Sequence, residues 1–232
     1  MGTIMTLGGG RYDDGEILPV LKHLVSLSEK AEPNVLYVPT AGFDYIIGDE
    51  VIFDSFRQFG CKVATLFLTD FSLTPADIER KVMSADIVYV GGGNLKFLMN
   101  TWKMTGADKI FRKAYDKGII LSGYSSGAMC WCTEGWDDCG EDHSFMFIDC
   151  IDILPYCCCP HFDGNSWCNF STEITTRKIT GLAVDNGAAV VFKDDEIYAL
   201  HGNDGGKAYF LSNDGTKSEE IPVKNAENND SV

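Results

Sequence analysis

The chain has 232 residues, of which 45% are hydrophobic and 23% are charged, as in an ordinary globular protein of one domain with a full core. Its formal net charge of −15 argues against nucleic acid and anionic membrane surfaces as partners, because both attract basic proteins. The sequence has no apolar run of about 18 residues, and its first residues lack the basic start of a signal peptide. We therefore expect a cytoplasmic protein.

Short apolar runs alternate with amphipathic segments along the first half of the chain, and this alternation predicts an α/β fold. The runs expected to form strands are residues 3–7, 34–38, 62–67, 86–90 and 118–121. The segments expected to form helices are residues 17–27, 49–59, 75 onward, 95–103 and 107–116. Strands that alternate with helices imply right-handed crossovers and a mostly parallel sheet covered on both faces. The expected architecture is therefore a three-layer sandwich.

The sequence Gly123-Tyr124-Ser125-Ser126-Gly127 follows the last of these strands and leads into small and apolar residues. A G-x-S-x-G between a buried strand and a helix is typical of a nucleophile elbow. The glycines permit a turn too tight for side chains, so the Ser125 hydroxyl is exposed at the top of the sheet. We expect Ser125 to be a catalytic nucleophile, with a structural turn as the alternative.

Glycine-rich loops follow two other predicted strands, at residues 8–10 and 91–93. Neither has the spacing of a dinucleotide or phosphate loop, so no cofactor is expected. Backbone N–H groups of glycines can approach a ligand closely, which makes Gly92 and Gly93 candidates for half of an oxyanion hole. The N–H of Ser126, directly after the nucleophile, would supply the other half. A tight strand-to-helix turn explains the glycines equally well.

A serine nucleophile needs a base, and the chain has four histidines. His161 follows Pro160 at the end of an apolar stretch beyond the elbow, where a base belongs. His143 lies in a very acidic loop, so a solvated role fits it better. His23 lies on the face of the first predicted helix. His201 precedes a glycine-rich loop far from the elbow. We therefore favour His161 as the base.

Eight of the nine cysteines fall between Cys130 and Cys168, and three of them are consecutive. No C-x-x-C pair, the usual start of a structural zinc site, occurs anywhere. The odd count and the adjacent positions also disfavour a secreted disulfide framework. We expect reduced, mostly buried thiols and no metal, with a zinc site near His143 and His161 as the alternative.

Three ordered motifs together resemble the peptidase E (aspartyl dipeptidase) and cyanophycinase family of serine peptidases. They are the glycine loop ending in Asn94, the elbow, and the sequence Pro160-His161-Phe162-Asp163. The resemblance implies a fold similar to class I glutamine amidotransferases and cleavage of short peptides, which in peptidase E carry an N-terminal aspartate. It matches Ser125 to the nucleophile, His161 to the base and residues 91–93 to the oxyanion loop.

The resemblance offers two places for the third member of the triad. Members similar to peptidase E carry the acid in the loop after the nucleophile helix, where Asp138 is our choice and Glu134 an alternative. Members similar to cyanophycinase carry a glutamate at the position of Asn186, so that arrangement looks broken unless Asp185 substitutes. A Ser-His dyad without an acid is the remaining option.

Beyond residue 192, residues 196–200 and 207–211 are expected to form a hairpin, followed by a polar tail. We predict one domain over residues 1–212 and a partly disordered tail over residues 213–232. The predicted function is hydrolysis of short peptides through an acyl-enzyme at Ser125. The alternatives are a catalytically silent binding protein and a non-peptidase esterase or amidase. Oligomeric state cannot be read from the sequence, and a homo-oligomer is one option.

Overall fold

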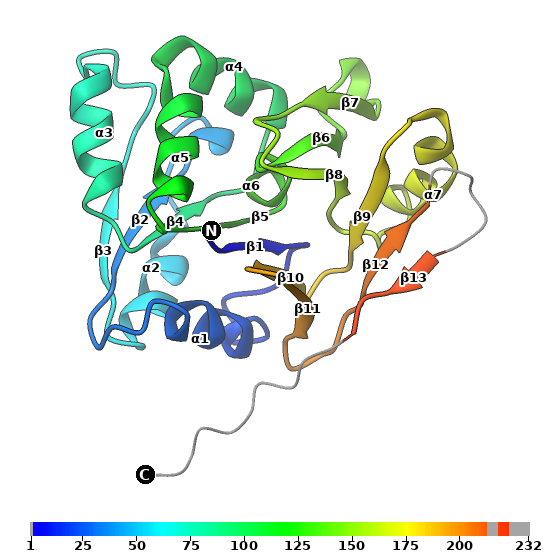
Figure 1. The fold of residues 1–232 in the computed structure, drawn as a ribbon, viewed down its shortest axis with the longest axis horizontal. Helices are drawn as coiled ribbons and strands as arrows, with labels where there is room; N and C mark the ends of the chain where they lie inside the picture. Colours follow the sequence, from blue (N-terminus) through cyan, green and yellow to red (C-terminus); the bar gives the residue numbers. More distant parts are fainter. Residues whose placement is uncertain (1, 213–217, 223–232) are drawn as a thin grey trace.

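The structure is a computed structural model that describes residues 2–212 and 218–222. Two β-sheets lie side by side, and helices cover both faces of the first sheet (Figure 1). The protein is therefore an α/β protein with mixed, largely parallel sheets.

The first sheet contains the predicted parallel strands and has the order β11-β10-β1-β5-β4-β2-β3. Its strands are β1 (Ile4–Leu7), β2 (Asn34–Val38), β3 (Lys62–Thr65), β4 (Ile87–Val90), β5 (Ile120–Tyr124), β10 (Ala188–Lys193) and β11 (Glu196–His201). Strands β1 to β5 pair in parallel, whereas β10 and β11 add an antiparallel edge. Strand β5, which carries the elbow, therefore lies near the centre of the sheet.

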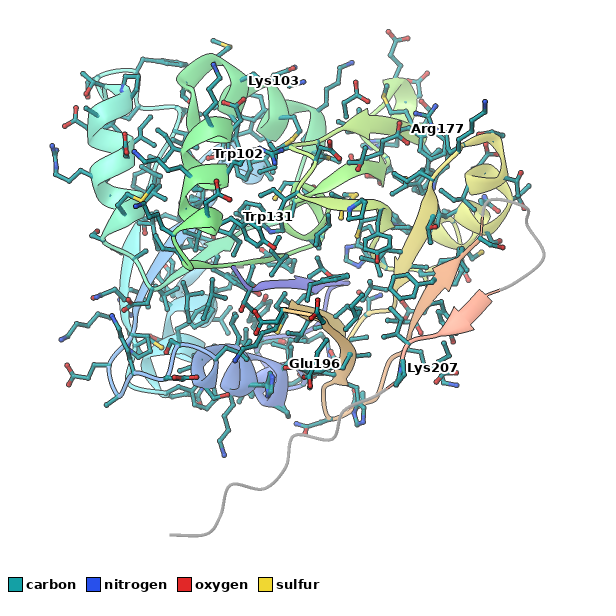
Figure 2. The ribbon with its side chains drawn as sticks, viewed as in Figure 1. Trp102, Lys103, Trp131, Arg177, Glu196 and Lys207 are labelled. Atoms are coloured by element: carbon teal, nitrogen blue, oxygen red, sulfur yellow. The ribbon has the colours of Figure 1, made fainter. Side chains whose placement is uncertain are left out.

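Helices pack on both faces of this sheet. One face is covered by α1 (Leu18–Ser26) and α2 (Glu50–Arg57), and the other by α3 (Pro75–Met83), α4 (Leu95–Thr105) and α5 (Ala107–Asp116). The predicted start of α3 is confirmed, because Thr74 caps the helix in a capping box with Asp77. The Trp102 and Trp131 rings are fully buried with centroids 5.4 Å apart (Figure 2), so aromatic packing fills the core beside the second sheet.

A second sheet of six strands was not expected from the sequence. Its order is β13-β12-β9-β8-β6-β7. Its strands are β6 (Cys132–Asp137), β7 (Met146–Asp149), β8 (Leu154–Cys159), β9 (Thr180–Val184), β12 (Ala208–Leu211) and β13 (Ser218–Glu220). A short helix, α6 (Ser126–Met129), connects the elbow directly to β6. The nucleophile is therefore only a few residues away from the second sheet.

The consecutive cysteines form the end of β8 and alternate between the two faces of the second sheet. Cys158 packs into the core shared with the first sheet, whereas Cys157 and Cys159 pack beneath the short helix α7 (Phe170–Glu173). All nine cysteines are free thiols. Burial raises the pKa of the Cys157 and Cys159 thiols. The cysteines here behave as small buried hydrophobes.

The C-terminal region differs from the sequence prediction. The expected hairpin of residues 196–200 with 207–211 is wrong, because β11 pairs with β10 whereas β12 pairs with β9 and β13. The chain crosses between the sheets here, since β11 buries Tyr198 and Leu200 in the first core and β12 buries Leu211 in the second. Within the expected tail, residues 213–217 and 223–232 lie outside the described residues, while Ser218–Glu220 forms β13. Across the described ranges, no helix is both long and apolar enough to cross a membrane.

Candidate active site

Ser125 lies at the turn between β5 and α6 in a conformation that few L-residues adopt. Its φ is 55° and its ψ is −122°, a combination that costs free energy and persists only where the surroundings enforce it. The two flanking glycines show how it is enforced. A Cβ on Gly123 or on Gly127 would collide with the carbonyl of Val90 in the neighbouring strand. The turn can therefore be this tight only with glycine on both sides of the serine.

His161 reaches Ser125 from the second sheet, directly after β8. Its backbone N–H donates to the Gly8 carbonyl at 3.2 Å, which ties this loop to the end of β1. Its Nε2 lies 3.0 Å from Ser125 Oγ. A Cβ on Gly9 would lie 2.5 and 2.6 Å from the imidazole ring, so the ring needs glycine at that position. The structure thus brings together the two residues expected to be nucleophile and base.

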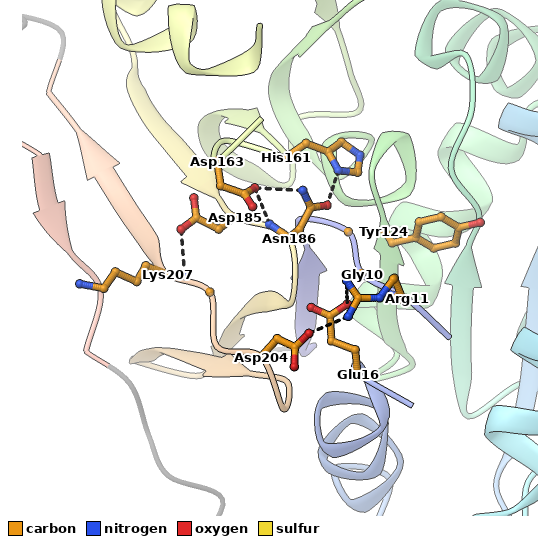
Figure 3. Close-up of a pocket in the computed structure, with 12 residues that line it drawn as sticks. Gly10, Arg11, Glu16, Tyr124, His161, Asp163, Asp185, Asn186, Asp204 and Lys207 are labelled. Carbon is orange, nitrogen blue, oxygen red and sulfur yellow. Dashed lines mark hydrogen bonds and ion pairs between the residues drawn. The ribbon is translucent and has the colours of Figure 1, made fainter. Parts of the chain in front are cut away.

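The other ring nitrogen of His161 is hydrogen-bonded to an amide. His161 Nδ1 lies 2.6 Å from Oδ1 of Asn186, which follows β9 (Figure 3). Behind it, Asp163 Oδ1 accepts from both the backbone N and Nδ2 of Asn186, at 2.8 and 3.0 Å. Asn186 therefore occupies the position that an acid holds in a Ser-His-Asp triad. The Asp163 carboxylate binds Asn186 on the side away from the imidazole.

The acids considered from the sequence lie elsewhere. Asp138 follows β6 and, within the described residues, has no hydrogen bond to His161. Glu134 forms an ion pair with Arg177, whose guanidinium also lies over the Phe147 ring. Asp185 accepts a hydrogen bond from the backbone N–H of Lys207 at 3.1 Å. Strands β6 and β9 lie on opposite sides of β8, which leads to His161, and the residue that meets the imidazole at Nδ1 comes from the loop after β9.

The glycine loop after β4 lies beside the elbow, as expected of an oxyanion loop. A Cβ on Gly92 would lie 3.1 Å from Ser125 Cβ, which places the loop against the nucleophile. The same Cβ would lie 2.9 Å from the Tyr124 ring, and burial raises the pKa of the Tyr124 hydroxyl. Ser126 Oγ donates to the Gly93 carbonyl at 2.6 Å. This bond joins the elbow to the glycine loop and fixes their relative position.

A buried carboxylate lies behind this junction. Asp137 is 1% exposed, its Oδ2 is 3.4 Å from Ser126 Oγ, and its Oδ1 has no hydrogen-bond partner among the described residues. Burial raises the pKa of Asp137 to about 6, and the charge of Asp138 contributes in the same direction. Asp137 is one of several acids in this segment that were candidates for the triad acid from the sequence, where nothing indicated that it is the buried one.

A polar pocket of about 820 Å³ opens beside His161, between the ends of the two sheets (Figure 3). Its charged lining residues are Arg11, Glu16, Asp163, Asp185, Asp204 and Lys207. Arg11 is paired with Asp204 at 2.6 Å and with Asp14, and Lys207 is paired with Glu220 at 3.1 Å. The two cations that line the pocket are therefore Arg11 and Lys207.

His143 is exposed in a 3-10 turn at Glu141–His143. The site residues missed from the sequence are Asp163 and Arg11. Asp163 was part of a recognised motif, and its position two residues after the base was the one available signal. Arg11 follows the first glycine loop, and its position after a parallel strand could have indicated the site.

A serine on a strained strand-to-helix turn, hydrogen-bonded to a histidine at the carboxyl end of an α/β sheet, defines a serine hydrolase. Comparison with known families makes the class narrower. The chain belongs to Peptidase family S51, whose profile matches residues 4–200. The protein is therefore a serine peptidase of this family, and the family implies a fold similar to class I glutamine amidotransferases.

Similar proteins agree with this assignment. The chain is 29% identical over 228 residues to the uncharacterized peptidase YgaJ of Bacillus subtilis (strain 168), covering 96% of this chain and 97% of that protein. It is 25% identical over 195 residues to the uncharacterized peptidase Lin0382 of Listeria innocua, covering 76% and 90%.

Two crystal structures share the fold. One is a peptidase from an acI-B1 Actinobacterium, with a TM-score of 0.73 and 18% identity over 96% of this chain and 95% of that one. The other is a putative peptidase E protein from Listeria monocytogenes EGD-e, with a TM-score of 0.65 and 18% identity over 87% and 98%. Their low identity makes them a comparison of fold alone.

Proposed function

We propose that the protein hydrolyses short peptides, dipeptides above all, through an acyl-enzyme on Ser125. The observation that carries the proposal is the 3.0 Å contact of Ser125 Oγ with His161 Nε2 at a strained elbow. In the first step Oγ attacks the peptide carbonyl carbon and its proton passes to Nε2. The tetrahedral intermediate then expels the amine, which takes the proton from His161, and water hydrolyses the ester by the same route.

The oxyanion hole in this proposal is formed by the N–H group of Ser126 together with an N–H group of the glycine loop, at Gly92 or Gly93. These donors belong to two backbone segments that the Ser126–Gly93 hydrogen bond joins. Donors held in place before the reaction stabilise developing charge at no cost of reorganisation.

The polar pocket beside His161 suits the charged ends of a short peptide. Recognition of an acidic N-terminal residue, the preference named by the resemblance to peptidase E, would use Arg11 or Lys207. Each of these cations already faces a carboxylate, and four acids line the pocket. A substrate screen therefore needs basic as well as acidic N-terminal residues.

The test is a dipeptide-library hydrolysis assay of the wild type and Ser125→Ala, run beside a short-chain ester. We expect hydrolysis of dipeptides, loss of several orders of magnitude in kcat in Ser125→Ala, and an unchanged circular dichroism spectrum. A fluorophosphonate probe should label Ser125, as located by peptide mapping. An adduct on Ser126, or ester hydrolysis without any dipeptide hydrolysis, would contradict the proposal.

A further inference from the structure

The side-chain amide of Asn186 lies between an imidazole and a carboxylate (Figure 3). Its Oδ1 is 2.6 Å from His161 Nδ1, and its Nδ2 is 3.0 Å from Asp163 Oδ1. An ionised carboxylate has only acceptors, whereas an amide has an acceptor at one end and two donors at the other. Asp163 therefore attracts the NH₂ end of Asn186 and leaves the oxygen facing His161.

The orientation of the amide determines the tautomer of the imidazole. Because Asn186 Oδ1 is an acceptor, Nδ1 must carry the proton, and Nε2 then keeps its lone pair toward Ser125 Oγ, 3.0 Å away. If the amide turned over, its NH₂ group would face Nδ1 and favour the tautomer with the proton on Nε2. That tautomer cannot accept the serine proton, so a turned amide would leave the base inactive.

We propose that Asp163 is a positioning residue that acts through Asn186: it holds the amide in the orientation that keeps His161 in the tautomer able to act as a base. This role rests on the proposed function. Asp163 is exposed, so water screens its charge, and its effect on His161 comes from the direction of its hydrogen bonds. Asparagine in the third position has two orientations, and Asp163 selects one of them.

If Asp163 acts by orienting the amide, its effect on kcat should depend on whether residue 186 is an asparagine. A purely structural role of Asp163 would not show this dependence. An aspartate at position 186 would have two equivalent oxygens and no wrong orientation. In that background Asp163 has nothing left to select, and its carboxylate would lie against another carboxylate. Removal of Asp163 should therefore lower kcat when residue 186 is asparagine, and should not lower it when residue 186 is aspartate.

The experiment is a double-mutant cycle of Asp163→Ala and Asn186→Asp, measured as kcat and KM on a dipeptide that the wild type hydrolyses. We expect Asp163→Ala alone to lower kcat about tenfold with little change in KM, the scale of one hydrogen bond. In the Asn186→Asp background the same change should leave kcat equal or higher. Asp163→Asn, which keeps an oxygen to accept both bonds from Asn186, should stay within about threefold of the wild type.

A matched control separates orientation from stability. Asp86 accepts from the backbone N and Nδ2 of Asn34 at 2.9 and 3.4 Å, the same pair of bonds at the opposite end of the sheet. Asp86→Ala should lower the thermal midpoint and leave kcat unchanged. An equal loss of kcat from Asp163→Ala in both backgrounds, or no loss in the wild type, would overturn the proposal.

A second measurement applies where the Asn186→Asp variants do not fold. The proton on His161 Nδ1 gives a low-field NMR signal, which we expect in the wild type and in Asp163→Asn and expect to weaken in Asp163→Ala. An unchanged signal in Asp163→Ala would overturn the proposal. Failure of the proposed function is seen separately, as dipeptide hydrolysis that survives Ser125→Ala.

Discussion

The two halves of the active site are built differently. The half that carries Ser125 belongs to the first sheet and consists mostly of backbone, with a strained turn and close-packed glycines. The base half belongs to the second sheet and is a chain of side chains, from His161 to Asn186 to Asp163. Backbone geometry tolerates almost no substitution, whereas a chain of side chains can exchange members that provide the same hydrogen bonds. The replacement of the triad acid by Asn186 occurs in this second, side-chain half.

Among variants of the base half, we expect the largest loss of kcat on substitution of His161. His161→Ala removes the group that accepts the serine proton, so kcat should fall by about 10⁴-fold or more. Labelling of Ser125 by a fluorophosphonate should be lost almost as completely. His143→Ala is the control, because this exposed histidine should leave both rates nearly unchanged. Retained labelling in His161→Ala would remove the histidine from the mechanism.

An intermediate effect is expected at the third position. Asn186→Ala removes the acceptor on His161 Nδ1, and we expect kcat to fall by about 10- to 100-fold, because the tautomer is no longer selected but the nucleophile and base remain. Asp138→Asn should change kcat by less than about twofold. Steady-state kinetics on one dipeptide would check both variants. The reverse order would return the role of triad acid to Asp138, the choice made from the sequence.

The last prediction concerns stability and not turnover, at the buried carboxylate of Asp137 behind the elbow half. The pKa of Asp137 is raised to about 6 by burial, so its stabilising contribution is complete below the unfolded value near 3.9 and is lost as pH rises through about 6. Ionised Asp137 should therefore cost the wild type about 2–3 kcal/mol of unfolding free energy between pH 4 and pH 8.

Urea denaturation of the wild type and Asp137→Asn across that pH range would measure this cost. The unfolding free energy of Asp137→Asn should not show this decrease with pH. The variant should therefore become more stable relative to the wild type as pH rises. A constant difference between the two proteins at all pH values would mean that Asp137 keeps an ordinary pKa in the folded state.

The elements of the first sheet could be predicted from the sequence because their signals are local. Apolar runs of four or five residues became β1, β2 and β4, and α3 begins at Pro75 as expected. The elbow was also local: a serine between two glycines after a buried strand has few other uses. His161 was identified by its place beyond the elbow and by the resemblance to a family. Each of these patterns spans only a few consecutive residues, so the backbone geometry and burial that it reflects can be predicted without knowing the tertiary contacts.

The tertiary structure alone decided the second sheet and the hydrogen bonds that connect His161 through Asn186 to Asp163. Strands β6 to β9 have four to six residues each and pair with segments far along the chain, so no local period marks their partners. Asn186 is 25 residues from His161 and Asp163 is 23 residues from Asn186, distances over which sequence patterns predict no contact. Only the parallel pairing of β8 with β9 brings these loops to one edge. The sequence by itself predicted Ser125 and its turn, and the fold decided which side chain meets His161 Nδ1, because hydrogen bonds between strand ends depend on register and not on spacing.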